Sequence, residues 1–274
     1  PSIHLIYRKY ITKIILKDHI YVDSNIMLKD VPILFEFSLN LQIEVHTEKD
    51  KYFPSIILEA TVNSPLINPI IFTNDFPENL IIIDEEAFVR CSNLQTLHFN
   101  EKIQSIGNGA FSYCTNLKSF NFPIGVTQVS RNIFNQCINL ESVIMHESIT
   151  TIGKSAFGYC DSLKTITIPE SVFSVGENCF EFCSNLTSIT IPHNITIISD
   201  SMFISCKKLN SVTFLGNPTS IGSSAFHSCN FTTFQFPDSI TSINQSAFRL
   251  CTNLISITIP EKVIIIEDSL FHSC

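Results

Sequence analysis

A phenylalanine followed three residues later by a cysteine recurs almost every 23 residues through the last three quarters of the chain. The first such pair is Phe88 and Cys91, and the last is Phe271 and Cys274. One interval, from Cys229 to Cys251, is 22 residues long. A fixed period of this length is typical of a solenoid, in which each repeat forms one coil and stacked coils share a continuous core.

The hydrophobic pattern within each repeat predicts three kinds of local structure. Residues 163–168 alternate apolar and polar side chains, which predicts a short strand with one buried face, and Pro169 then ends that strand. Val172 and Val175 follow three residues apart and predict an extended segment. Apolar residues within 152–163 have the spacing of one helical face, which predicts a short helical turn before the next strand.

The repeat divides the chain into two predicted regions. Residues 70–274 are expected to form a solenoid of about nine coils with about 23 residues per coil. Residues 1–69 lack the repeat but alternate apolar and polar residues in places, so we expect an N-terminal β-rich cap or flanking region. Cys274 falls in the middle of a repeat, and further coils are expected to follow it in the full protein.

The repeat follows the pattern L-x-x-I-x-I-P-x-x-V-x-x-I-G-x-x-A-F-x-x-C-x-x closely at residues 163–185, with Cys179 in the alanine position, and at residues 94–116, with Asn100 in the proline position. This pattern resembles the BspA-like branch of the leucine-rich repeat superfamily. The resemblance implies short parallel β-strands on the concave face of the solenoid, with extended segments and short helical turns on the other side. Leu215 in the proline position and Pro218 in the valine position depart from the pattern, and we expect local distortion there.

The strand residues that point away from the core form two mostly polar columns. Thr and Ser suit any exposed sheet, but a continuous hydroxyl-rich surface is also a platform for a protein or glycan partner. The candidate partner-binding residues on the concave face are Thr96, His98, Ser119, Asn121, Ser142, Ile144, Thr165, Thr167, Ser188, Thr190, Ser211, Thr213, Thr233, Gln235, Ser256 and Thr258.

The ten cysteines invite a disulfide framework or a metal site, but their arrangement favours buried free thiols. Equivalent positions in neighbouring coils lie ~4.8 Å apart, beyond the usual Cβ separation of a disulfide. The chain has no C-x-x-C motif and no histidine pair at a zinc-like interval. Of the eight histidines, only His227 and His272 share a repeat position, so we expect no catalytic group, metal or cofactor.

Charge and hydropathy exclude two further classes of partner. The chain has 25 acidic and 17 basic residues, a net charge of −8, which argues against binding to nucleic acid or an anionic membrane. The apolar stretch 11–22 is too short to span a bilayer and contains charged residues, so we expect no membrane insertion of this segment.

Asparagines recur just before the predicted strands and are expected to form a ladder of hydrogen bonds to the backbone, at Asn93, Asn116, Asn139, Asn185 and Asn253. N-glycosylation sequons occur at Asn185, Asn194, Asn230 and Asn244. Asn194 lies in a predicted turn and is the expected acceptor if the protein is secreted.

The sequence thus predicts a non-catalytic interaction module. The resemblance implies a cell-surface or secreted protein that adheres to a host or matrix protein or glycan through the concave sheet. The alternative is an intracellular, cytoplasmic scaffold of the same fold that mediates protein–protein interaction, because free thiols persist in a reducing compartment.

Overall fold

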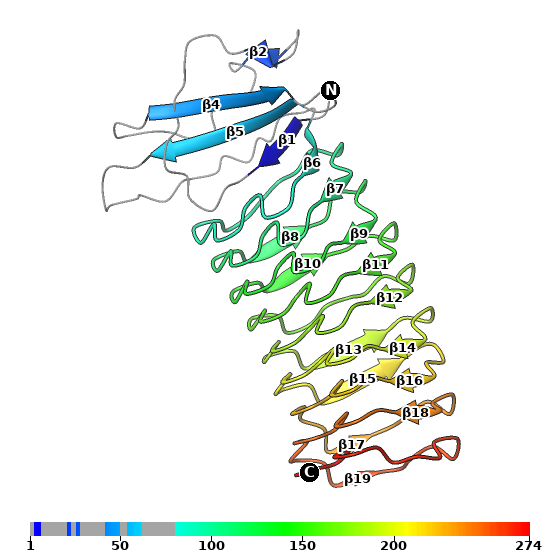
Figure 1. Cartoon of the computed structure of the whole chain (residues 1–274). Coiled ribbons are helices and arrows are strands. Elements are labelled where there is room, and N and C mark those ends of the chain that lie inside the picture. The colour runs from blue at the N-terminus through cyan, green and yellow to red at the C-terminus, as the bar shows by residue number, and fades with distance from the viewer. Residues whose placement is uncertain (1–2, 7–20, 23–25, 28–41, 50–53, 62–79) are drawn as a thin grey trace.

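The structure is a computed structural model that describes residues 80–274 and five strands before them. These strands are β1 (Ile3–Ile6), β2 (Tyr21–Val22), β3 (Ile26–Met27), β4 (Gln42–Lys49) and β5 (Pro54–Thr61). Residues 80–274 form a parallel β-solenoid of about eight turns with about 23 residues per coil, which confirms the predicted fold (Figure 1). The predicted boundary between residues 69 and 70 lies outside the described residues.

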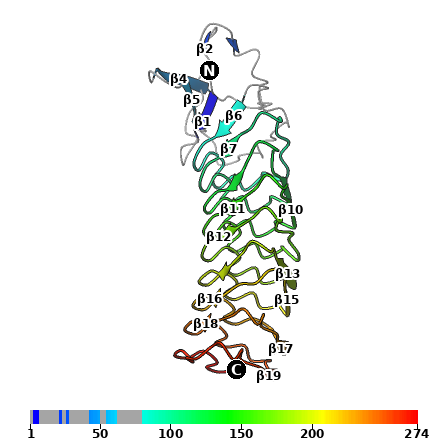
Figure 2. The same cartoon turned by 90° about the vertical axis from the view of Figure 1, so that its right-hand side faces the viewer.

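Two ladders of short parallel strands run along the solenoid, on different sides of the column (Figures 1 and 2). Strands of the first ladder pair residue for residue with the next coil, as Ser142 does with Ser119 and Thr190 with Thr213. The first ladder contains β8 (Ser119–Asn121), β10 (Ser142–Ile144), β13 (Ser188–Ile191), β15 (Ser211–Phe214), β17 (Thr233–Phe234) and β19 (Ser256–Ile257).

The second ladder lies where the sequence predicted an extended segment. Each coil contributes about two residues, which pair in parallel with those of the neighbouring coil. The ladder contains β6 (Leu80–Ile83), β7 (Ser105–Ile106), β9 (Gln128–Val129), β11 (Thr151–Ile152), β12 (Ser174–Val175), β14 (Ile197–Ile198), β16 (Ser220–Ile221) and β18 (Ser242–Ile243).

The described N-terminal strands join the start of this second ladder. The sheet has the order β4-β5-β1-β6-β7, in which β1 pairs in parallel with both β5 and β6. β4 and β5 form an antiparallel pair of eight residues each, and β2 and β3 form a separate antiparallel pair. Hydrogen bonding therefore continues from the first coil into the N-terminal strands.

The remaining side of each coil is a run of turns and not the expected helical turn, and the described residues contain no helix. Ser155 and Tyr159 have left-handed φ angles of 50° and 60°, and other coils repeat this pair four residues apart. Some backbone N–H groups in these turns donate to the next coil, and others donate to a carbonyl of their own coil. Phe157 donates to the carbonyl of Cys179 in the next coil (2.9 Å), whereas Cys160 donates back to Phe157 (3.3 Å). A helix would direct every N–H along its own axis and would lose these bonds between coils.

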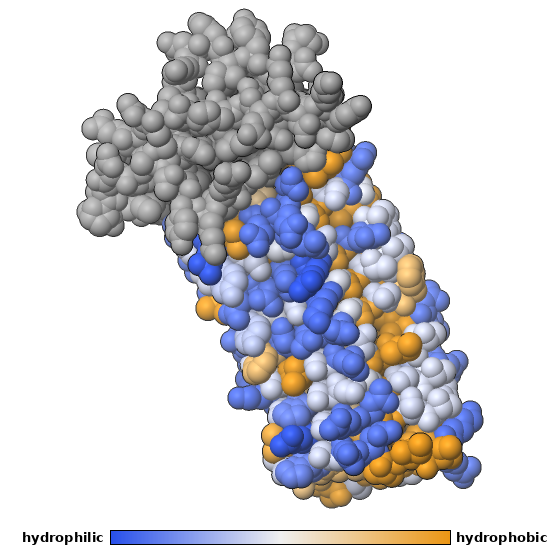
Figure 3. Space-filling view, viewed as in Figure 1, coloured by the Kyte–Doolittle hydropathy of each residue, from blue (hydrophilic) through white to orange (hydrophobic). Residues whose placement is uncertain are grey.

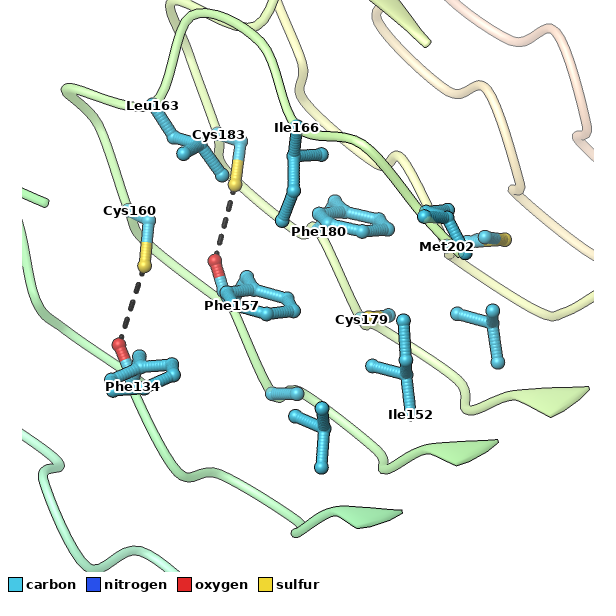
Figure 4. Packing of buried hydrophobic residues seen from close by; sticks show 14 of the residues in the cluster. Phe134, Ile152, Phe157, Cys160, Leu163, Ile166, Cys179, Phe180, Cys183 and Met202 are labelled. Carbon is cyan, nitrogen blue, oxygen red and sulfur yellow. Dashed lines mark hydrogen bonds between the residues drawn. The ribbon is translucent and has the colours of Figure 1, made fainter. Parts of the chain in front are cut away.

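Phenylalanine rings form the centre of the core. Phe157 and Phe180 stack with their ring centroids 5.4 Å apart and their planes 4° from parallel, and Phe203 continues the stack at 5.5 Å from Phe180. All three rings are fully buried. Figure 4 shows the rings of Phe134, Phe157 and Phe180 in successive coils, with Leu163 and Ile166 nearby. Each coil therefore covers the ring of its neighbour, as expected for a solenoid.

Gly176 shows how closely the coils approach at the corner that follows the second ladder. A Cβ atom at this position would lie 2.4 Å from the backbone nitrogen of Lys154 in the preceding coil. A side chain would therefore force the two coils apart unless the backbone shifted. The same close approach explains the glycine at Gly153, where a Cβ would lie 2.6 Å from the nitrogen of Arg131.

The cysteine of each repeat packs inward as a free thiol, and eight of the ten cysteines are buried. Each thiol of the series donates to the carbonyl of a phenylalanine 25 or 26 residues earlier, as Cys183 does to Phe157 (3.1 Å) and Cys160 to Phe134 (3.3 Å), both drawn in Figure 4. Burial raises the pKa of Cys137 to about 12. The cysteine thus acts as a small buried side chain with one weak hydrogen bond.

The irregular repeats distort the solenoid only locally. Leu215 is exposed where other coils have a buried or half-buried proline, while Pro218 is buried in the valine position. The short repeat after Cys229 keeps its place in both ladders, because Ser242 still pairs with Ser220 and Thr233 with Ser256. The missing residue is therefore absorbed in the connection between the ladders.

The stacked core predicts a large difference between inward and outward substitutions. Phe157→Ala should lower the free energy of unfolding by about 3–5 kcal/mol, because it removes a ring from between two others. Thr167→Ala, on an exposed side chain of the next coil, should change it by less than about 0.5 kcal/mol. Urea titrations followed by circular dichroism measure both values, and equal losses would contradict the assignment of the two positions.

The buried thiols predict that the fold weakens in alkali. Below the ordinary thiol pKa of 9.0 both the folded and the unfolded chain keep the proton, so the stabilisation is complete. Above it the unfolded chain loses protons first, and the free energy of unfolding should fall by roughly 1.4 kcal/mol per pH unit for each thiol, up to about pH 12 for Cys137.

Urea titrations between about pH 8 and about pH 11, the range in which thiols ionise, measure this slope. The matched control is Cys137→Ala, which should show a shallower slope by roughly one thiol's share. An unchanged slope in that variant would show that the thiols do not cause the alkaline loss of stability.

Candidate functional site

The sixteen candidate residues lie on the outward side of the first ladder and of the equivalent segments in the coils between its strands. All are exposed except Ser119, which is half-buried. We call these sixteen residues the first strand face. Their inward neighbours are core residues, as Ile166 is between Thr165 and Thr167. Strand pleating therefore separates the two sets, with the core on one side and the candidate residues on the other.

Parallel pairing brings equivalent residues of neighbouring coils side by side on this face. Ser188 lies opposite Ser211 and Thr190 opposite Thr213. In the first part of the ladder, Ile144 lies opposite Asn121. The structure thus brings the candidate residues together as two columns along the solenoid axis.

The chemistry available on the first strand face is hydrogen bonding with one apolar centre. Most of its side chains are hydroxyls or amides, which both donate and accept. Ile144 is 61% exposed in their midst. Three of the eight exposed residues just before the strands are charged, with alternating sign in successive coils: Lys118, Glu141 and Lys164. The face therefore has a polar surface, an exposed aliphatic side chain and three charges along part of its border.

The resolved ion pairs lie away from this face and join neighbouring coils. Lys154 and Glu177 are 2.6 Å apart, and the hydrogen bond from Lys154 lowers the pKa of Glu177. His193 Nδ1 lies 3.0 Å from Glu170, and the bond from the histidine side chain lowers the pKa of Glu170. All four side chains are largely exposed, so these pairs stabilise the coils only weakly.

The asparagine ladder is present where the structure resolves its bonds. The side-chain amides of Asn139 and Asn185 donate to carbonyls of the preceding coil at 2.7 Å. Asn253 instead donates to the side chain of Asn230, at the short repeat. Among the sequons, Asn194 is exposed, and Asn185, Asn230 and Asn244 are half-buried. Glycosylation of these asparagines remains a prediction.

The second ladder presents an outward face that the sequence analysis missed. Two consecutive residues per coil are exposed or half-buried between two buried ones, as Phe173 and Ser174 are between Val172 and Val175. The repeat spacing V-x-x-I contained this signal, since it leaves two residues between the inward positions. We call this set the second strand face: Gln104, Ser105, Thr127, Gln128, Thr150, Thr151, Phe173, Ser174, Thr196, Ile197, Thr219, Ser220, Thr241, Ser242, Ile264 and Ile265.

The described part of the chain presents neither a candidate metal-binding cluster nor a membrane-spanning helix. That part contains no group of three or more histidine, cysteine, aspartate or glutamate side chains placed to hold a metal ion. Nor does it contain a helix of the length and apolarity that crossing a bilayer requires.

Comparison with known proteins identifies the repeat. The family model described as the BspA type leucine rich repeat region matches residues 70–187 and 173–274, with six copies. No curated protein matches the chain. Among solved structures, a leucine-rich repeat protein from Bacteroides ovatus is 28% identical, with a TM-score of 0.64, over 88% of this chain and 69% of that one.

A second solved structure, the leucine-rich repeat protein TpLRR of T. pallidum, is 26% identical over 57% of this chain and 72% of that one, with a TM-score of 0.52. The family match covers most of the chain and coincides with the observed solenoid. This chain belongs to the BspA-type leucine-rich repeat family.

Proposed function

We propose that this chain is a non-catalytic interaction module of a cell-surface or secreted protein, and that it binds a host or matrix protein or a glycan through the first strand face. Leucine-rich repeats of this family generally serve as protein-interaction modules. The observation that carries the proposal is the continuous exposure of the candidate residues along successive coils. Many hydrogen-bonding groups in fixed positions allow a partner to make several weak contacts at once.

The border of the first strand face supports a protein as the partner. Lys118, Glu141 and Lys164 are exposed in successive coils beside the hydroxyl columns, so this part of the border alternates in charge. Ile144 is exposed within the face and would be covered by a partner. An apolar anchor inside a polar and charged rim is the usual arrangement of a protein interface.

The second candidate is an intracellular scaffold of the same fold. The ten free cysteines favour it, because unpaired thiols persist most easily in a reducing compartment. Burial of eight of them weakens this argument, since a buried thiol with a raised pKa is a poor nucleophile in any compartment. We therefore place the surface role first.

Cellular location separates the two candidates. Antibodies against residues 80–274 should label the full-length protein on intact, unpermeabilised cells if it is displayed at the surface. Permeabilised cells provide the control for antibody access. Labelling that requires permeabilisation would overturn the surface role and leave the scaffold.

Binding through the first strand face predicts a face-specific effect of one bulky charge. Thr167→Arg should weaken binding to immobilised matrix proteins or arrayed glycans at least about tenfold, because the arginine would separate the partner from several coils. Thr196→Arg, at another exposed threonine on the second strand face, is the matched control and should bind the matrix proteins as the parent chain does. Equal losses in both variants, or none in Thr167→Arg, would contradict this location of the site.

A further inference from the structure

The second strand face contains no charged side chain in any of the coils that it crosses, from Gln104 to Ile265. It shares this with the sixteen residues of the first strand face, in a chain with 42 charged residues among 274, and differs from that face in its exposed aromatic ring. In Figure 3, white and orange surface predominates along the side of the column where the second ladder lies in Figure 1. An extended uncharged strip offers nothing to an ionic partner, and it avoids the cost of desolvating charges when an uncharged partner binds.

Several hydroxyl groups of the second strand face donate hydrogen bonds to other residues of the same face. Thr150 Oγ1 donates to the carbonyl of Thr127 (3.2 Å), and Thr241 Oγ1 donates to that of Thr219 (3.1 Å). Ser242 Oγ donates to the hydroxyl of Ser220 (2.9 Å). A hydroxyl has one donor and two acceptor positions, so these oxygens keep their capacity to accept. The face therefore favours a ligand that brings many O–H donors.

Two exposed apolar side chains lie in the middle of the hydroxyl array. Phe173 is 57% exposed and Ile197, in the next coil, is 56% exposed. Other coils have threonine, glutamine or isoleucine where Phe173 stands, so the fold does not require an aromatic ring at this position. An aromatic face carries partial negative charge and attracts the slightly positive C–H groups of a sugar ring.

We propose that the second strand face binds a neutral polysaccharide, with one chain lying along the solenoid and a sugar ring stacked on Phe173. The lack of charge selects against anionic polysaccharides, and the acceptor oxygens suit the many hydroxyl donors of a neutral one. The coils repeat every ~4.8 Å, so successive sugars meet similar groups and the weak contacts add along the chain.

This site is separate from the first strand face and does not depend on the function proposed for it. The two ladders lie on different sides of the column (Figure 2), so substitutions on one face leave the other intact.

Affinity electrophoresis of the 274-residue chain tests the proposal, in native gels that contain dextran, laminarin or galactomannan. At least one of these neutral polysaccharides should retard the chain, whereas polygalacturonate should not. Phe173→Ala should weaken the retardation about tenfold, because it removes the stacking surface. Phe173→Tyr keeps a ring and should retain binding.

The matched control is Ile124→Ala, in a turn outside both strand faces, where the side chain removed is 59% exposed and so comparable with Phe173. It should bind the polysaccharide as the parent chain does. Three results would overturn the proposal: no retardation by the three neutral polysaccharides, equal loss in Phe173→Ala and Ile124→Ala, or undiminished binding by Phe173→Ala. None of these results bears on the first strand face, whose role is tested separately by comparing Thr167→Arg with Thr196→Arg.

Discussion

The stacking of one coil on the next is the interaction on which the rest of this structure depends. A single coil of about 23 residues cannot bury its apolar side chains, and each phenylalanine is covered only because the next coil supplies another ring, as Phe180 does for Phe157. Close stacking of the coils also explains two other repeated residues. The thiol of Cys183 donates to the carbonyl of Phe157 in the preceding coil, and Gly176 has no side chain because the backbone of the preceding coil lies close to it. These repeated residues are therefore consequences of packing, and they carry no information about a partner.

Function must then reside in the outward positions that stacking leaves unconstrained. Parallel pairing places these positions in columns, because each coil repeats the geometry of the one before it, as Thr190 and Thr213 show. A column cannot gather an acid, a base and a nucleophile around one point as an enzyme site requires. A column of similar side chains can instead offer a partner the same weak contact in many coils, and the sum of these contacts can hold the partner.

The sequence predicted the features that burial controls and missed those that depend on backbone conformation. The apolar periodicity, which stacking requires in every repeat, predicted the coil length, the strand at residues 163–168 and the inward direction of the cysteines. The turns around Phe157 were mistaken for a helical turn because the spacing of apolar residues fits both structures. Only the left-handed φ angles at Ser155 and Tyr159 separate them, and neither residue type signals that conformation. The second strand face was missed for a similar reason: two consecutive exposed residues between Val172 and Val175 do not alternate, so they lack the signature of a strand.

The two faces differ in chemistry although the same core positions both. Neither face contains a charged residue, but the first has an exposed isoleucine, Ile144, among its hydroxyls and amides, whereas the second has an exposed aromatic ring at Phe173. The stacked core holds both ladders in one column, so a partner on one side would not cover the other (Figure 2). With both faces acting as proposed, one chain would hold a protein and a neutral polysaccharide at the same time. Because both faces belong to one chain, binding to the protein would keep the second strand face close to polysaccharide in the same place. The two weak interactions would therefore strengthen each other wherever protein and polysaccharide occur together.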